Sequence, residues 1–151
     1  QAGIDAASDG DTVLVGAGTY VENIDYSSKQ LVIASHFLGS DGDNDVISNT
    51  IIDGDSTVSC VTMNGNESEL IGFTLTNGLS TSEGNGSAVT ISAASELSYC
   101  LLINNYGNAP IIISGYSSSF DHLTIYDPGA GKRIGFLNCY CIQLARQNLE
   151  G

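Results

Sequence analysis

The chain has 151 residues and carries 4 Lys and Arg against 17 Asp and Glu, which gives a formal net charge of −13. This balance argues against a nucleic-acid partner, because such binding depends on clustered cations. The chain has no run of 18 apolar residues, so we expect no membrane insertion. Its length is that of one domain, 1–151. No charged leader opens the chain at Gln1, so we expect any signal peptide to lie outside these residues.

The first residues predict a short N-terminal cap helix over 1–8, with Ile4 and Ala7 on its inner side. Short apolar runs separated by Gly, Asp and Asn follow, and these are typical of strands with tight corners. We expect such strands at 12–15, 19–21, 31–33, 50–52, 61–63, 88–91 and 111–113. Between two of them, residues 40–45 predict a polar loop.

A nine-residue pattern recurs in the second half of the chain and predicts the fold. Its copies begin at residues 70, 97 and 120, so they are 27 and 23 residues apart. The first, fourth and sixth places of each copy are apolar, and we predict one strand per copy with these places facing inward. A strand that recurs at this period indicates a solenoid, in which each coil buries its inner face by stacking on the next. We therefore expect an all-β chain with five or six coils over 12–127.

Several segments carry a family resemblance. The run Gly-Asp-Thr-Val-Leu-Val at 10–15, the Gly-Thr-Tyr at 18–20 and the Gly-Phe-Thr-Leu-Thr-Asn-Gly at 72–78 resemble right-handed parallel β-helix repeat proteins of the pectin-lyase-like superfamily. The resemblance implies a right-handed parallel β-helix with an N-terminal capping helix. It also implies a secreted bacterial protein, located outside the cell or on its surface. Many members have no known activity, so the resemblance implies architecture better than chemistry.

Residues 128–151 form a C-terminal segment of different character, with three of the four cations. Phe136, Cys139 and Cys141 could be a last copy of the strand pattern, although the step of 16 residues from Phe120 is short for a full coil. The alternative is a terminal amphipathic helix over 136–147. We expect a strand followed by a cap that covers the open end of the solenoid.

The four cysteines, Cys60, Cys100, Cys139 and Cys141, have no zinc-site spacing. Cys100 stands where the other copies have Phe73 and Leu123, so we expect it to be a small buried core residue. A disulfide framework is the alternative.

Catalytic signatures are sparse. Asp121 and His122 could form an oriented general base, and Asp127 could be a second carboxylate on the same strand, as glycoside hydrolysis would need. The cationic and acidic signatures of lyases, esterases and glycosidases are not found. We therefore expect a non-catalytic extracellular or cell-surface module, with a polysaccharide as candidate ligand, or the N-terminal part of a larger surface protein. The alternative is a carbohydrate-active enzyme, a polysaccharide lyase or glycoside hydrolase, with an unrecognised site.

We expect no organic cofactor, and one candidate metal site. Asp41, Asp43 and Asp45 place carboxylates at alternate positions, like the start of a Ca²⁺ loop. The match to an EF-hand fails, because Val46 stands where Gly is needed and Ile52 where the bidentate Glu belongs. The alternative is a solvated acidic loop.

The last expectation concerns self-association. The fifth and seventh places of each strand copy should point outward, and they change from Thr74 and Thr76 to apolar residues further along. If a strand at Phe136 keeps this register, one outward stripe contains Leu101, Ile103, Tyr126, Tyr140 and Ile142. A contiguous apolar stripe usually marks a contact surface, so we predict a homodimer.

Overall fold

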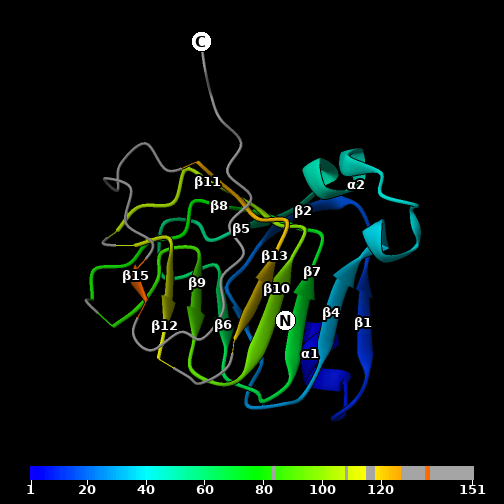
Figure 1. The fold of residues 1–151 in the computed structure, drawn as a ribbon, viewed down its shortest axis with the longest axis horizontal. Helices are drawn as coiled ribbons and strands as arrows, with labels where there is room; N and C mark the ends of the chain where they lie inside the picture. The colour runs from blue at the N-terminus through cyan, green and yellow to red at the C-terminus, as the bar shows by residue number, and fades with distance from the viewer. Residues whose placement is uncertain (83, 108, 115–117, 127–134, 137–151) are drawn as a thin grey trace.

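The computed structural model describes residues 1–82, 84–107, 109–114, 118–126 and 135–136, and it describes residues 135 and 136 by their backbone alone. In these residues the chain winds through three parallel sheets of five strands each (Figure 1). The first sheet, sheet A, contains β1 (Thr12–Val15), β4 (Val32–Ser35), β7 (Ser68–Ile71), β10 (Ser95–Ser98) and β13 (Ser119–Asp121). Sheet B contains β2 (Gly18–Val21), β5 (Thr50–Asp53), β8 (Thr74–Thr76), β11 (Leu101–Ile103) and β14 (Thr124–Tyr126). Sheet C contains β3 (Ile24–Asp25), β6 (Val61–Met63), β9 (Val89–Ile91), β12 (Ile111–Ile113) and β15 (Gly135–Phe136).

Each sheet takes one strand from every coil, so the architecture is a parallel β-helix, as predicted. Equivalent positions of successive coils stand in register: Leu70 pairs with Leu97 in sheet A, and Leu75 with Leu102 in sheet B. These four side chains are fully buried. Because adjacent strands lie about 4.8 Å apart, each inward residue packs directly on its equivalent in the next coil.

The nine-residue repeat is not one strand, contrary to the prediction. β7 ends at Ile71 and β8 begins at Thr74, and Gly72 between them has a φ of +81°. This left-handed residue turns the chain from sheet A into sheet B. The apolar first and sixth places of a copy therefore face the same core from two different sheets.

The column predicted at the fourth place is confirmed. Phe73 and Cys100 are buried, and the amide of Leu101 donates to the Phe73 carbonyl at 2.9 Å. The amide of Thr124 donates in the same way to the Cys100 carbonyl at 3.0 Å, which places Leu123 next in the column. Leu123 is half-buried.

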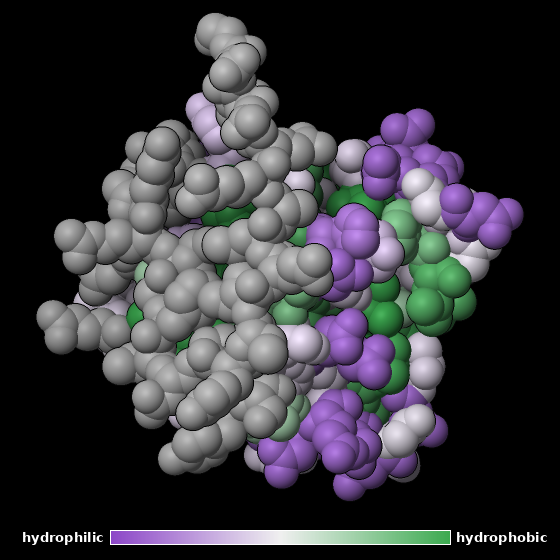
Figure 2. Space-filling view, in the orientation of Figure 1, coloured by the Kyte–Doolittle hydropathy of each residue, from purple (hydrophilic) through white to green (hydrophobic). Residues whose placement is uncertain are grey.

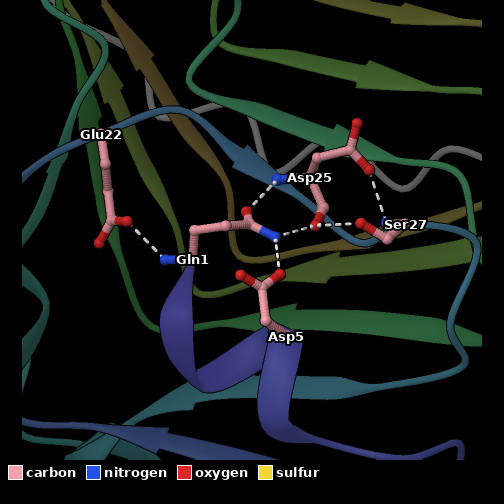
Figure 3. A network of polar contacts seen from close by, with 5 residues as sticks. All are labelled: Gln1, Asp5, Glu22, Asp25 and Ser27. Carbon is pink, nitrogen blue, oxygen red and sulfur yellow. Dashed lines mark hydrogen bonds and ion pairs between the residues drawn. The ribbon is translucent and has the colours of Figure 1, made fainter.

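The N-terminal helix α1 (Ala2–Ala6) caps the first coil and buries Ile4. The Gln1 side chain ties the start of this helix to sheet C (Figure 3). Its Nε2 donates to the Asp25 carbonyl at 3.0 Å, and its Oε1 accepts from the Asp25 amide at 2.9 Å. The α-amino group of Gln1 also forms an ion pair with Glu22.

Lys29 ties down the other end of the same helix. Its Nζ donates to the carbonyls of Ile4, Asp5 and Ala7 at 2.8, 3.0 and 2.8 Å. A cation is favourable at these carbonyls, because a helix leaves its last carbonyls without partners. The helix is too short to be stable alone, so these polar ties and the burial of Ile4 hold it.

The loop expected between β4 and β5 contains more structure than predicted. It forms the 3₁₀-helix η1 (His36–Gly39) and the helix α2 (Asn44–Asn49). This excursion lies over the outer face of sheet B, where Thr74 donates from Oγ1 to the Ile47 carbonyl at 2.9 Å. Thr74 does point outward, as predicted, but α2 covers it and leaves only 3% of it exposed.

The last described strand differs from its prediction. In β15, Phe136 pairs with Ile113 of β12, so it continues sheet C and does not repeat the pattern of residues 70–78. The short step of 16 residues from Phe120 is the distance from one sheet to another within a coil. Cys139, Cys141 and the choice between a cap and a helix over 137–151 lie outside the described residues.

Cys60 and Cys100 are free thiols inside the core, and the expectation of a buried core residue at Cys100 is confirmed. Burial raises the pKa of each thiol to about 12. In the described part of the chain, no helix is long and apolar enough to cross a membrane.

Candidate functional site

An aromatic column lies along the corner between sheets A and B. Gly72, Tyr99 and His122 occupy this corner in three successive coils, and Tyr99 and His122 have φ values of +52° and +48°. A Cβ at Gly72 would lie only 2.7 Å from the Cβ of Phe37. Gly72 therefore leaves room for Phe37, which reaches in from η1 and takes the place of a side chain in this column.

The rings stack along the column. Phe37 and Tyr99 have centroids 4.8 Å apart and are tilted by 37°, and Tyr99 and His122 have centroids 4.5 Å apart and nearly parallel ring planes, at 10°. Both faces of Tyr99 are thus in contact with neighbouring rings. The outer face of His122 is not stacked against any other described aromatic ring, and 62% of this side chain is exposed.

The column forms one wall of a groove of about 390 Å³. A second wall is formed by Gly42, in the loop before α2, and by Asn44, Ile47 and Ser48 of α2. Between the walls lie residues of sheet B and its leading corner, Cys100, Leu101, Leu123 and Thr124. The groove thus combines aromatic and aliphatic surface with uncharged hydroxyl and amide groups, the mixture common in ligand sites.

The predicted pair Asp121 and His122 lies at the edge of this groove. Asp121 ends β13, and its Oδ1 is 2.7 Å from the Nδ1 of His122. The carboxylate can hold the imidazole in one orientation and leave Nε2 for a ligand or water. Both side chains are more than half exposed, so solvent screens the pair.

A two-carboxylate site is not seen at this groove. Asp127 lies outside the described residues. Asp121 ends β13 and His122 is the corner residue before β14, so the single strand predicted to contain both of them is divided. Among the described residues that line the groove there is no Asp or Glu.

The three aspartates of the expected calcium loop are placed around the start of α2. Asp43 is the N-cap of this helix, and its Oδ1 accepts from the Asp45 amide at 2.9 Å. Asp41 has a left-handed φ of +52° in the turn before it. No group of three or more metal-binding side chains is found within the described ranges, so these residues are not gathered into a metal centre there.

The predicted outward stripe is divided in the structure. Leu101 is half-buried and belongs to the groove, whereas Ile103 and Tyr126 pair with each other two residues further along their strands. Tyr126 is 63% exposed. Tyr140 and Ile142 lie outside the described residues, and the register used to place them was wrong, because Phe136 lies in sheet C.

Phe37 and Tyr99 were missed by the sequence interpretation. The signal was present in the repeat, whose third place holds Gly72, Tyr99 and His122. A glycine in a column that otherwise holds rings indicates that another side chain fills its place. The sequence alone does not say that Phe37 is that side chain.

Comparison of the chain with protein-family models, with curated proteins and with solved structures gave no match. The fold and the groove are therefore the basis for a functional interpretation.

Proposed function

We propose that this protein is a non-catalytic module of an extracellular or cell-surface protein, and that its groove binds a saccharide. The observation that carries the proposal is the composition of the groove: its lining combines an aromatic column with uncharged polar groups. A sugar ring has an apolar face of C–H groups and a rim of hydroxyls. It would place its apolar face on the exposed part of the His122 ring and its hydroxyls toward Asn44, Ser48 and Thr124, which line the same groove.

Membership of the pectin-lyase-like superfamily, a secreted bacterial origin and a place at the start of a larger surface protein belong to the same proposal. The motifs at 10–15 and 72–78 support them, together with the parallel sheets and the N-terminal helix. Exposed acidic residues suit a surface location but do not require it.

The test is calorimetric titration of the protein with linear gluco-, xylo-, manno- and galacto-oligosaccharides. We expect at least one of them to bind, and His122→Ala to weaken that binding roughly three- to tenfold, the value of one aromatic contact. Tyr106→Ala is the matched control: Tyr106 is 46% exposed and is not among the residues lining the groove, so its loss should leave the affinity unchanged.

Two results would overturn the proposal. One is the absence of binding to every oligosaccharide of the panel at millimolar concentration. The other is binding that His122→Ala and Tyr106→Ala affect equally, because the ligand would then lie elsewhere.

A hydrolytic enzyme is the second candidate, and the contact between Asp121 and His122 favours it. A carboxylate that orients an imidazole can make Nε2 a general base for water. The test is incubation of the same oligosaccharides, and of their O-acetylated forms, with product detection by chromatography. Turnover that Asp121→Asn abolishes would establish the enzyme, and binding without any product would exclude it for these substrates.

A further inference from the structure

The distribution of charge around the groove bears on the class of saccharide that it accepts. Lys29 is the only Lys or Arg among the described residues. Its ammonium is held by three carbonyls of the N-terminal helix, whereas the groove lies between α2 and the later coils. The polar side chains that line the groove, apart from His122, are the neutral Asn44, Ser48, Tyr99 and Thr124. An acidic saccharide would find no described Lys or Arg side chain there to pair with its carboxylates.

A carboxylate beside the groove repels anions. Asp121 contacts His122 on the groove wall, and 56% of its side chain is exposed. The outer face of sheet A continues this charge, with Glu69 and Glu96 paired on neighbouring strands. Figure 2 shows this hydrophilic surface over the middle of sheet A. Charges within about 8–10 Å of one another interact appreciably at physiological ionic strength, so this face lowers the local concentration of anions.

We infer that the groove selects uncharged saccharides over uronates of the same linkage, and that Asp121 is a specificity-determining residue. The inference rests on the proposed function and narrows it. Asp121 acts in two ways: it orients His122 under the sugar ring, and it disfavours a carboxylate on that ring.

The experiment compares one neutral oligosaccharide with its C6-oxidised uronate counterpart at pH 8 and low salt, by calorimetry on the whole chain. We expect the uronate to bind at least about tenfold more weakly, a difference that 0.5 M NaCl should reduce. Asp121→Asn should reduce the difference to less than about threefold. The preference for the neutral ligand is a readout that a merely structural role of Asp121 would not change.

Glu67→Gln is the control for the loss of one charge. Glu67 accepts a hydrogen bond from the Gln30 side chain just before β7 begins, whereas Asp121 ends β13, so the two lie at opposite ends of the parallel strands of sheet A. Glu67→Gln should leave the preference unchanged.

The outcomes separate the two proposals. Uronates that bind as tightly as the neutral ligands, or a preference that Asp121→Asn leaves intact, would overturn this inference while the saccharide site stands. Binding of neither class overturns the proposed function and the inference with it.

Discussion

Thr74 and Thr124 occupy the same outward place on sheet B, two coils apart, and have opposite environments. Both pair with Leu101, which stands between them in the sheet. Thr74 lies under α2 and is buried, and its hydroxyl donates to the Ile47 carbonyl. Thr124 is exposed and lines the groove.

The difference comes from one excursion and not from the repeat itself. The η1–α2 segment leaves the coil after β4 and covers β5 and β8, but it ends before β11 and β14. Its far edge becomes a groove wall, and Phe37 from the same segment starts the aromatic column. The groove therefore forms on the outer face of sheet B at the point where the η1–α2 segment ends.

The largest effect should come from the core, which lies beneath both the part of sheet B that α2 covers and the part that it leaves exposed. Phe73→Ala should lower the free energy of unfolding by about 3–5 kcal/mol, because Phe73 is buried and the coils cannot collapse around the cavity. Leu123→Ala, in the same column but half-buried, should cost no more than about 2 kcal/mol. Urea unfolding measures both, and equal losses would contradict the difference in burial between Phe73 and Leu123.

The second effect is the pH dependence of stability that two buried thiols produce, Cys100 under the groove and Cys60 away from it. Burial raises the pKa of both thiols from 9.0 to about 12, so the folded state holds these protons more tightly than the unfolded state. The contribution of these protonated thiols to the free energy of unfolding should be fully present below pH 9. It should fall by roughly 1.4 kcal/mol per pH unit per thiol between pH 9 and pH 12.

Cys100→Ala and Cys60→Ala should each flatten this dependence, measured as the midpoint of urea unfolding against pH. Alkylation by iodoacetamide at pH 8 should be slow at both thiols in the folded protein. Rapid modification of Cys100 alone would show that sheet B opens to solvent at β11 and β14, the strands that α2 does not cover.

The third effect tests the comparison directly. Thr74→Val keeps the shape of the side chain but removes the hydroxyl that donates to the partly buried Ile47 carbonyl, so it should cost about 0.5–1.5 kcal/mol. Thr124→Val makes the same change at the exposed position and should stay within about 0.5 kcal/mol. Thermal unfolding gives both values, and a neutral Thr74→Val would mean that α2 does not rest on this strand.

The smallest effect on stability concerns self-association, which we propose for the outward surface of Ile103 and Tyr126. Ile103→Asp with Tyr126→Asp should convert a dimer into a folded monomer in light scattering, with little change in unfolding at low protein concentration. Leu14→Asp adds a charge at another exposed apolar residue, on β1, and should leave the dimer intact. A wild type that is monomeric at high concentration would exclude this dimer.

Much of the architecture could be predicted from the sequence, because a solenoid repeats one local pattern. The apolar places Leu70, Leu97 and Phe120 stand in one column of sheet A, as their spacing indicated. The cap helix and the buried Cys100 follow from equally local signals, a short amphipathic stretch and a core position in a repeat.

The corner within the repeat and the site beside it were decided by the tertiary structure. Tyr99 and His122 look like ordinary strand residues in the sequence, and only Gly72 at the equivalent place in the first copy indicates a turn there. Phe37 joins Tyr99 from 62 positions earlier in the chain, and only the packing of the excursion against the coils brings them together. The sequence by itself determined the periodic core, since each coil repeats it, whereas the groove depends on a single irregular segment that no repeat describes.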